Sequence, residues 1–177
     1  ENGCSSIATT TIIEPEALTM TLDTVDVVCF GDETGSISVS ASGGTPPYEY
    51  AINGGDFQPD TDFIGLAAGN YDVVVQDSRG CTFNLSTIIN QPPPIVVDAG
   101  NDQTIDLGYT ADINAIVTPI NLPVTLTWSP SITLDCGDCL SPTALPFGTT
   151  TYLLTAIDAN GCIGLDSVTI FVNLIRP

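Results

Sequence analysis

The chain has 177 residues, with 21 Asp and Glu against 2 Lys and Arg and no His, and its formal net charge is −19. This charge repels nucleic acids and anionic membranes, and the chain has no apolar run of about 18 residues, so we expect neither nucleic-acid binding nor membrane insertion. Without His or Lys the remaining acid–base groups are carboxylates and Tyr, and no Ser or Cys is placed beside an activating base, so no catalytic residue is predicted and the chain is expected not to be an enzyme.

Apolar and polar residues alternate in many short windows, which predicts β-strands with one buried face. The alternating apolar positions, in chain order, are Ile37, Val39 and Ala41; Tyr48, Tyr50 and Ile52; Tyr71, Val73 and Val75; Ala111, Ile113, Ala115 and Val117; Val124, Leu126 and Trp128; Tyr152, Leu154 and Ala156; and Val168, Ile170, Val172 and Leu174. Turn signals such as Gly43-Gly44 and Asn160-Gly161 separate them. This spacing predicts an all-β chain of antiparallel β-sandwiches.

A Gly-Cys element occurs three times, at Gly3-Cys4, Gly80-Cys81 and Gly161-Cys162, with the copies 77 and 81 residues apart. Asp77 and Asp158 each stand four residues before their Cys. A fixed period of this length predicts tandem units. Residues 1–15 are then interpreted as the C-terminal end of a preceding repeat.

The prolines in Gln91-Pro92-Pro93-Pro94 mark a boundary, because proline fixes φ and lacks the amide donor that a sheet needs. We therefore expect one sandwich over residues 16–93 and a second over residues 94–177. A proline-stiffened junction is semi-rigid, which predicts an extended rod.

Residues 16–93 closely resemble the SprB-type repeat of very large cell-surface adhesins in gliding Bacteroidota. The resemblance lies in Cys29-Phe30-Gly31-Asp32, in Gly43-Gly44-Thr45-Pro46-Pro47-Tyr48-Glu49-Tyr50 and in Asp77-Ser78-Arg79-Gly80-Cys81. It implies a disulfide-supported β-sandwich at the cell surface, with gliding motility as the setting and export by the type 9 secretion system.

The second unit resembles an immunoglobulin-like or polycystic-kidney-disease-like domain. The motifs are Ala99-Gly100-Asn101-Asp102, Trp128-Ser129-Pro130 and Asp158-Ala159-Asn160-Gly161-Cys162. The Trp-Asp-Phe-Gly-Asp-Gly stretch of typical polycystic-kidney-disease domains is missing. The two resemblances together imply tandem immunoglobulin-like sandwiches.

Six Cys without His favour disulfides over zinc, and hence an extracellular location. We expect Cys29 to pair with Cys81, which would close a loop worth about 4 kcal/mol in the chain-entropy model. Cys136 and Cys139 are predicted to form a local disulfide. A redox role would require a βαβ context and a zinc site would require a second CxxC pair or His, and the sequence shows none of these. Cys4 and Cys162 remain unassigned: Cys162 is either a buried free thiol or a competitor for the Cys136–Cys139 pair.

Asp98 and Asp102, with Asp72 or Asp77, are the candidate ligands for a structural calcium ion. No Asp-x-Asp-x-Asp-Gly loop is present, and Asp also favours turns and solvated faces, so we prefer that explanation and predict no cofactor.

Asp23-Thr24-Val25 and Asp166-Ser167-Val168 fit the O-glycosylation pattern that the family resemblance implies, which makes Thr24 and Ser167 candidate sites.

The leading hypothesis is a non-enzymatic structural and adhesive segment of a secreted cell-surface adhesin or filament. Its expected partners are neighbouring repeats of the same chain, another copy joined by strand addition, and an unidentified extracellular ligand such as a surface polysaccharide. The alternative is an accessory β-sandwich spacer, or a carbohydrate-binding module, of a secreted polysaccharide-degrading enzyme. Many similar repeats in the same gene would favour the adhesin, and a hydrolase domain would favour the accessory role.

Overall fold

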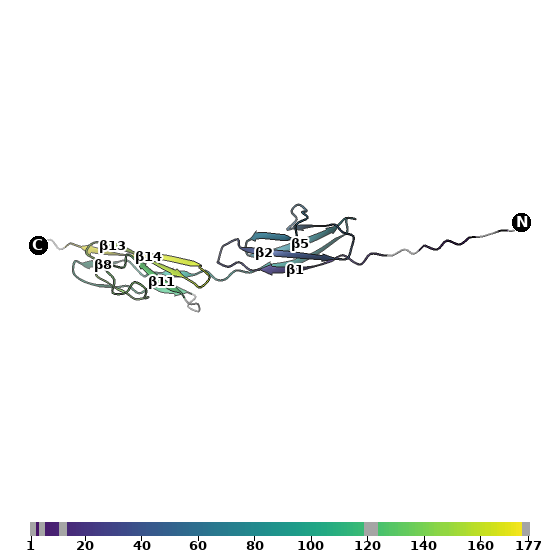
Figure 1. Cartoon of the computed structure of the whole chain (residues 1–177). Coiled ribbons are helices and arrows are strands. Elements are labelled where there is room, and N and C mark those ends of the chain that lie inside the picture. The colour runs from purple at the N-terminus through teal and green to yellow at the C-terminus, as the bar shows by residue number, and fades with distance from the viewer. Residues whose placement is uncertain (1–2, 4–5, 11–13, 119–123, 175–177) are drawn as a thin grey trace. The chain divides into compact units, whose positions relative to one another are not determined.

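The computed structural model of the chain describes residues 3, 6–10, 14–118 and 124–174. The chain divides into two compact units (Figure 1): unit 1 comprises Glu1–Val25 and Gly35–Ile89, and unit 2 comprises Asp26–Thr34 and Asn90–Pro177. All regular elements in the described ranges are strands, so the predicted all-β fold is confirmed. In the same ranges no helix is long and apolar enough to cross a membrane.

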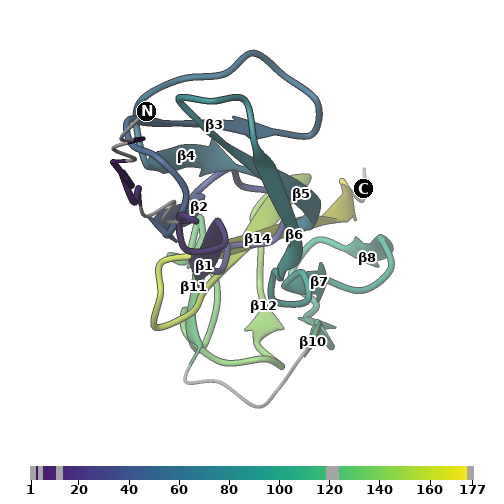
Figure 2. The ribbon, with the colours of Figure 1, turned by 90° about the vertical axis from the view of Figure 1, so that its right-hand side faces the viewer.

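Unit 1 consists of two three-stranded antiparallel sheets, with strand orders β1-β2-β4 and β3-β5-β6. The strands are β1 (Thr19–Val25), β2 (Gly35–Ser42), β3 (Tyr48–Ile52), β4 (Asp62–Leu66), β5 (Gly69–Asp77) and β6 (Thr82–Ile89). Figure 2 labels all six in a second view. Each sheet contributes one apolar face to the core.

The core of unit 1 follows the alternation that the sequence shows. Ile37 and Val39 of β2 and Val73 and Val75 of β5 are all buried, while the residues between them are polar or less buried. Tyr50 of β3 joins this core, and its burial, with a smaller effect of the neighbouring Tyr48, raises the pKa of its phenol. The buried and the exposed faces of β2 and β5 are therefore the ones that the alternation in the sequence predicts.

Unit 2 is built on a four-stranded sheet of order β11-β13-β14-β8, with two strand pairs, β10-β7 and β12-β9. The strands are β7 (Val96–Asp98), β8 (Gln103–Asp106), β9 (Ala111–Asp112), β10 (Ile116–Thr118), β11 (Thr125–Ser129), β12 (Thr143–Ala144), β13 (Thr150–Ile157) and β14 (Ile163–Asn173). Strand β8 pairs with β14 in parallel, whereas the sequence predicted antiparallel sheets.

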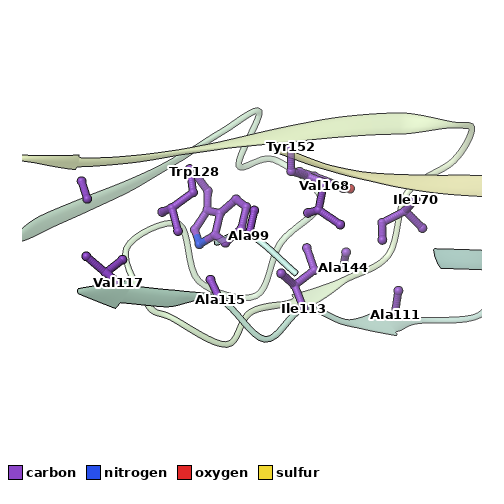
Figure 3. Close-up of a cluster of buried hydrophobic side chains, with 12 residues drawn as sticks. Ala99, Ala111, Ile113, Ala115, Val117, Trp128, Ala144, Tyr152, Val168 and Ile170 are labelled. Carbon is purple, nitrogen blue, oxygen red and sulfur yellow. The ribbon is translucent and has the colours of Figure 1, made fainter. Parts of the chain in front are cut away.

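The core of unit 2 lies between two facing layers (Figure 3). Tyr152, Val168 and Ile170 point into the core from β13 and β14, and Ile113 and Ala115 face them from the opposite layer. The most voluminous buried side chain, Trp128, also donates a hydrogen bond from Nε1 to the Cys139 carbonyl, at 2.9 Å. Trp128 is therefore a core residue, as predicted.

The window from Ala111 to Val117, predicted as one strand, forms two short strands, β9 and β10. Between them, the N–H groups of Ile113 and Ala115 donate to the carbonyls of Pro142 and Leu140, at 2.9 Å each. These partners lie in a loop and not in a regular strand, so the ladder is interrupted although the inward side chains remain buried.

The division of the chain differs from the predicted one at Asp26–Thr34, which lies between β1 and β2 but belongs to unit 2. The Val27 N–H donates to the Asn90 carbonyl at 2.9 Å, and the Asn90 N–H donates to Asp26 Oδ1 at 2.8 Å. The Gly31 N–H donates to Gln91 Oε1, also at 2.8 Å. We call Asp26–Thr34 the clasp segment. Sequence periodicity did not reveal this assignment, because the segment has no alternating pattern.

We predict that Leu154→Ala lowers the unfolding free energy of unit 2 by about 2–5 kcal/mol, because it opens a cavity in the core. Leu154 is fully buried and lies opposite Trp128 in the β11–β13 ladder. Urea denaturation followed by Trp128 fluorescence measures this change, because Trp128 is the single Trp of the chain.

The matched control is Leu153→Ala, which removes the same atoms from the neighbouring residue of β13, where the side chain is 40% exposed. We expect a loss below about 1 kcal/mol for this control. Equal losses in the two variants would contradict the assignment of the two faces of β13.

Candidate functional site

The second copy of the Gly-Cys element forms the tight turn between β5 and β6. The Gly80 N–H donates to the Asp77 carbonyl, and the Asp77 N–H donates to the Cys81 carbonyl, both at 2.9 Å. Gly80 has a φ of +83°, a conformation that disfavours side chains with a Cβ. This is a three-residue hairpin loop in which glycine takes the left-handed position.

The side chain of Asp77 holds this turn together. Its Oδ1 accepts hydrogen bonds from the N–H groups of Arg79 and Cys81, and its Oδ2 accepts one from the Thr45 N–H, all at 2.9 Å. Burial by itself raises the pKa of Asp77, but these three hydrogen bonds and the charge of Arg79 outweigh it and lower the pKa below its ordinary value. Asp77 is therefore a structural anchor that joins the closing turn to the loop at Thr45.

The third copy of the element, between β13 and β14, has the same geometry. Asp158 Oδ1 accepts the N–H groups of Asn160 and Cys162, at 2.8 and 2.9 Å, and Gly161 has a φ of +87°. In the second and third copies, the Asp four residues before the Cys is thus the residue that caps the closing turn. The sequence repeat contained this signal, although its role as a hydrogen-bond acceptor was not predicted.

The structure joins Cys29 to Cys162, with a Cα–Cα distance of 5.4 Å, and not to Cys81 as predicted. Cys29 lies in the clasp segment and Cys162 lies at the closing turn of unit 2. The disulfide therefore joins the clasp segment to the turn between β13 and β14, within unit 2. It also assigns Cys162, which the sequence left without a partner.

The predicted pairing of Cys29 with Cys81 was wrong because β6 separates the two positions. The clasp segment is hydrogen-bonded to Asn90 and Gln91, directly after β6 ends, whereas Cys81 directly precedes the start of β6. Cys81 and Asn90 flank this strand, and the nine residue steps between them span about 30 Å at the usual rise per residue. A disulfide requires Cα atoms within about 7 Å. Counting residues in the chain did not show that Cys29 belongs to unit 2 and Cys81 to unit 1.

The structure also contains a disulfide between Cys136 and Cys139. Its loop lies against the core, because Trp128 donates from its backbone N–H to the Gly137 carbonyl and from Nε1 to the Cys139 carbonyl. Within the described part of the chain, Cys81 is a free and exposed cysteine. Cys4 lies outside the described residues.

The four calcium candidates are engaged in hydrogen bonds with the protein. Asp98 Oδ1 accepts the Gly100 N–H at 2.9 Å, and Asp102 Oδ1 accepts the Thr169 N–H at 2.7 Å. Asp72 Oδ1 accepts the Ser86 hydroxyl, and Asp77 caps its turn as described above. Among residues 3, 6–10, 14–118 and 124–174, no three His, Cys, Asp or Glu side chains come together to hold a metal ion.

The two glycosylation candidates lie within strands. Ser167 is exposed in β14, and Thr24 is partly buried in β1. Attachment of a sugar at Ser167 requires no change in the packing of unit 2, whereas Thr24 offers less access.

A shallow apolar hollow of about 380 Å³ lies on unit 2, where Ile132, Leu145 and Phe147 are exposed. The carboxylate that lines it, Asp135, accepts the Thr143 N–H at 2.7 Å. The hollow therefore presents apolar contact area, and Asp135 is the one carboxylate that lines it among the described residues.

The strand content and sheet arrangement define the class of the protein: it is an all-β protein of immunoglobulin-like sandwiches. Residues 21–57, which run from β1 past β3 and include the clasp segment, match the model of the SprB repeat family. This match supports an extracellular, adhesin-type structural segment. No curated protein sequence matches the chain.

Several solved structures of tandem domains are similar to the chain. The N-terminal eight Ig domains of Down Syndrome Cell Adhesion Molecule match at 13% identity over 89% of this chain and 25% of that chain, with a TM-score of 0.41. The I9–I11 tandem of titin matches at 12% identity over 89% and 67%, with a TM-score of 0.46. The C-terminal fragment of intimin, solved with the intimin-binding domain of its translocated receptor, matches at 10% identity over 85% and 63%, with a TM-score of 0.42.

We predict that a non-reduced digest of the oxidised protein contains a peptide pair linked through Cys29 and Cys162, whereas Cys81 reacts with iodoacetamide without denaturant. Pepsin at low pH is the suitable protease, because thiolates are needed for disulfide exchange and are scarce there. Mass spectrometry identifies the pairs. A peptide pair linked through Cys29 and Cys81 would contradict the structure.

We also predict that unit 1 loses stability as the pH falls below about 4. The pKa of Asp77 is depressed in the folded state, so its stabilising effect is complete above the pKa of the unfolded chain and is lost as the folded carboxylate takes up a proton. In Asp77→Asn this contribution is missing at all pH values. The variant should therefore be less stable than the wild type at pH 7, with a smaller difference at pH 2.5.

Hydrogen exchange of the β5 and β6 amides measures this effect. Taking the ratio of wild-type to variant rates at each pH cancels the intrinsic pH dependence of exchange. Asp60→Asn is the control, because Asp60 is exposed and lies in the same unit. A stability difference that does not depend on pH would count against the role of the Asp77 charge.

Proposed function

We propose that this chain is a non-enzymatic structural and adhesive segment of a large secreted cell-surface adhesin or filament, exported by type 9 secretion and used in gliding motility. The observation that carries the proposal is the SprB repeat over residues 21–57, within a chain built of β-sandwiches. Neighbouring repeats of the same polypeptide are the partners that this role requires first.

The chemistry of the described residues supports a structural role. The buried carboxylate of Asp77 caps a turn, and the carboxylates of Asp158 and Asp166 accept backbone N–H groups. Long antiparallel ladders, such as β5–β6 and β13–β14, supply most of the pairing. Such a chain acts through the surface it presents and through its resistance to unfolding.

The acidic surface fits an exported segment. A net charge of −19 over 177 residues keeps copies of the chain apart in solution and lowers non-specific association with anionic surfaces. Adhesion would then depend on defined contact regions on the sandwiches.

An in-frame deletion of residues 16–177 from the native gene tests the proposal. Antibodies against these residues should label intact wild-type cells and should fail to label cells that lack type 9 secretion. The deletion strain should attach less to surfaces and glide less. The full-length gene returned to the deletion strain is the control.

Labelling of intact cells that is retained without type 9 secretion would refute the export route. Normal attachment and gliding in the deletion strain, combined with loss of polysaccharide hydrolysis, would favour the accessory role in an enzyme.

A further inference from the structure

The Cys29–Cys162 disulfide joins two positions that are 133 residues apart in the sequence. Cys29 follows β1, the first strand, and Cys162 directly precedes β14, the last strand. The covalent loop closed by this bond therefore contains every strand from β2 to β13. Of the strands in the described residues, β1 and β14 lie outside it.

We propose that this bond is a covalent bypass for tension: force applied to the two ends of the chain passes along β1, through the Cys29–Cys162 sulfurs and along β14. The inference rests on the proposed function, since tension acts on a segment of a surface adhesin. The strands inside the loop are shielded, because the loop cannot lengthen while its two ends remain bonded.

The length that the bond removes from the stretched chain is large. The 133 residue steps between the two Cys would reach about 480 Å if fully extended. The disulfide holds the two Cα atoms at 5.4 Å instead. Residues 1–29 and 162–177 remain extensible, so the oxidised chain should reach about one quarter of the length of the reduced chain.

The two strands on the load path are already almost fully extended. A β-strand rises about 3.3 Å per residue, against a maximum of about 3.6 Å, so the eleven residues of β14 can gain only about 3 Å. Tension along β14 between Cys162 and the C-terminal side therefore does not need to pull it out of its sheet. The same holds for β1, which ends four residues before Cys29.

Without the bond, tension would take a different path through unit 2. It would enter from the chain after β6 and leave along β14. Strand β8 pairs with β14 in parallel, from Gln103 opposite Ile170 to Asp106 opposite Asn173, and this ladder would be loaded in shear. Its failure would release the strands of unit 2 one after another, whereas the disulfide prevents this release even if the hydrogen bonds break.

Single-molecule force spectroscopy on the 177-residue chain, held through handles at both termini, tests the proposal. Oxidised wild-type protein should show a total contour length about one quarter of that measured after reduction with a phosphine. The double variant Cys29→Ser/Cys162→Ser should reach the full length without reductant. This readout stays valid if that variant folds poorly, because the contour length of the stretched chain does not depend on folding.

The Cys136→Ser/Cys139→Ser variant is the matched control. It also removes a disulfide, but one whose sequence separation is 3 and which lies inside the large loop. Its contour length should equal that of the oxidised wild type. Cys81→Ser should also leave the length unchanged.

Oxidised wild-type protein that extends as far as the Cys29→Ser/Cys162→Ser variant would overturn the bypass. This outcome is separate from failure of the proposed function, because the measurement uses the isolated chain. A deletion strain with normal attachment would refute the adhesive role and leave the measured bypass in place.

Discussion

The Cys29–Cys162 disulfide is the constraint on which the organisation of this chain depends. It attaches the clasp segment, which leaves unit 1 after β1, to the closing turn of unit 2. In the chain-entropy model, closing a loop of this size restricts the unfolded chain by about 5 kcal/mol, compared with about 2 kcal/mol for the short Cys136–Cys139 loop. The long-range bond therefore has the larger effect on both folding and extension.

Each unit is small, and a domain of this size buries only about 60 to 65% of its unfolded surface. The chain adds local constraints to its apolar cores. Asp77 and Asp158 cap the closing turns with their carboxylates, and the Cys136–Cys139 loop holds its carbonyls against Trp128. The acidic residues thus have two roles: together they make the chain strongly negative, and some of them cap turns by accepting backbone N–H groups. Three of the four Asp residues named as candidate calcium ligands, Asp77, Asp98 and Asp102, accept backbone hydrogen bonds.

Much of the fold was predictable, because period-two alternation reports directly which face of a strand is buried. Val73 and Val75 are buried as expected, and so are Tyr152, Leu154 and Ala156. The window from Ala111 to Val117 showed the limit of this signal: its inward positions were correct, but Ile113 and Ala115 lie between two short strands and their N–H groups bond to a loop. The parallel pairing of β8 with β14 was also missed, since alternation carries no information about the direction of a neighbouring strand.

The sequence by itself determined the all-β class, the repeated Asp-x-x-Gly-Cys turns and the SprB resemblance, because these depend on residues close together in the chain. Only the tertiary structure decided the partner of Cys29 and the unit to which Asp26–Thr34 belongs. A disulfide depends on a distance in space, and Cys29 belongs to unit 2 with Cys162, whereas Cys81 belongs to unit 1. Spacing along the chain carries no measure of that separation.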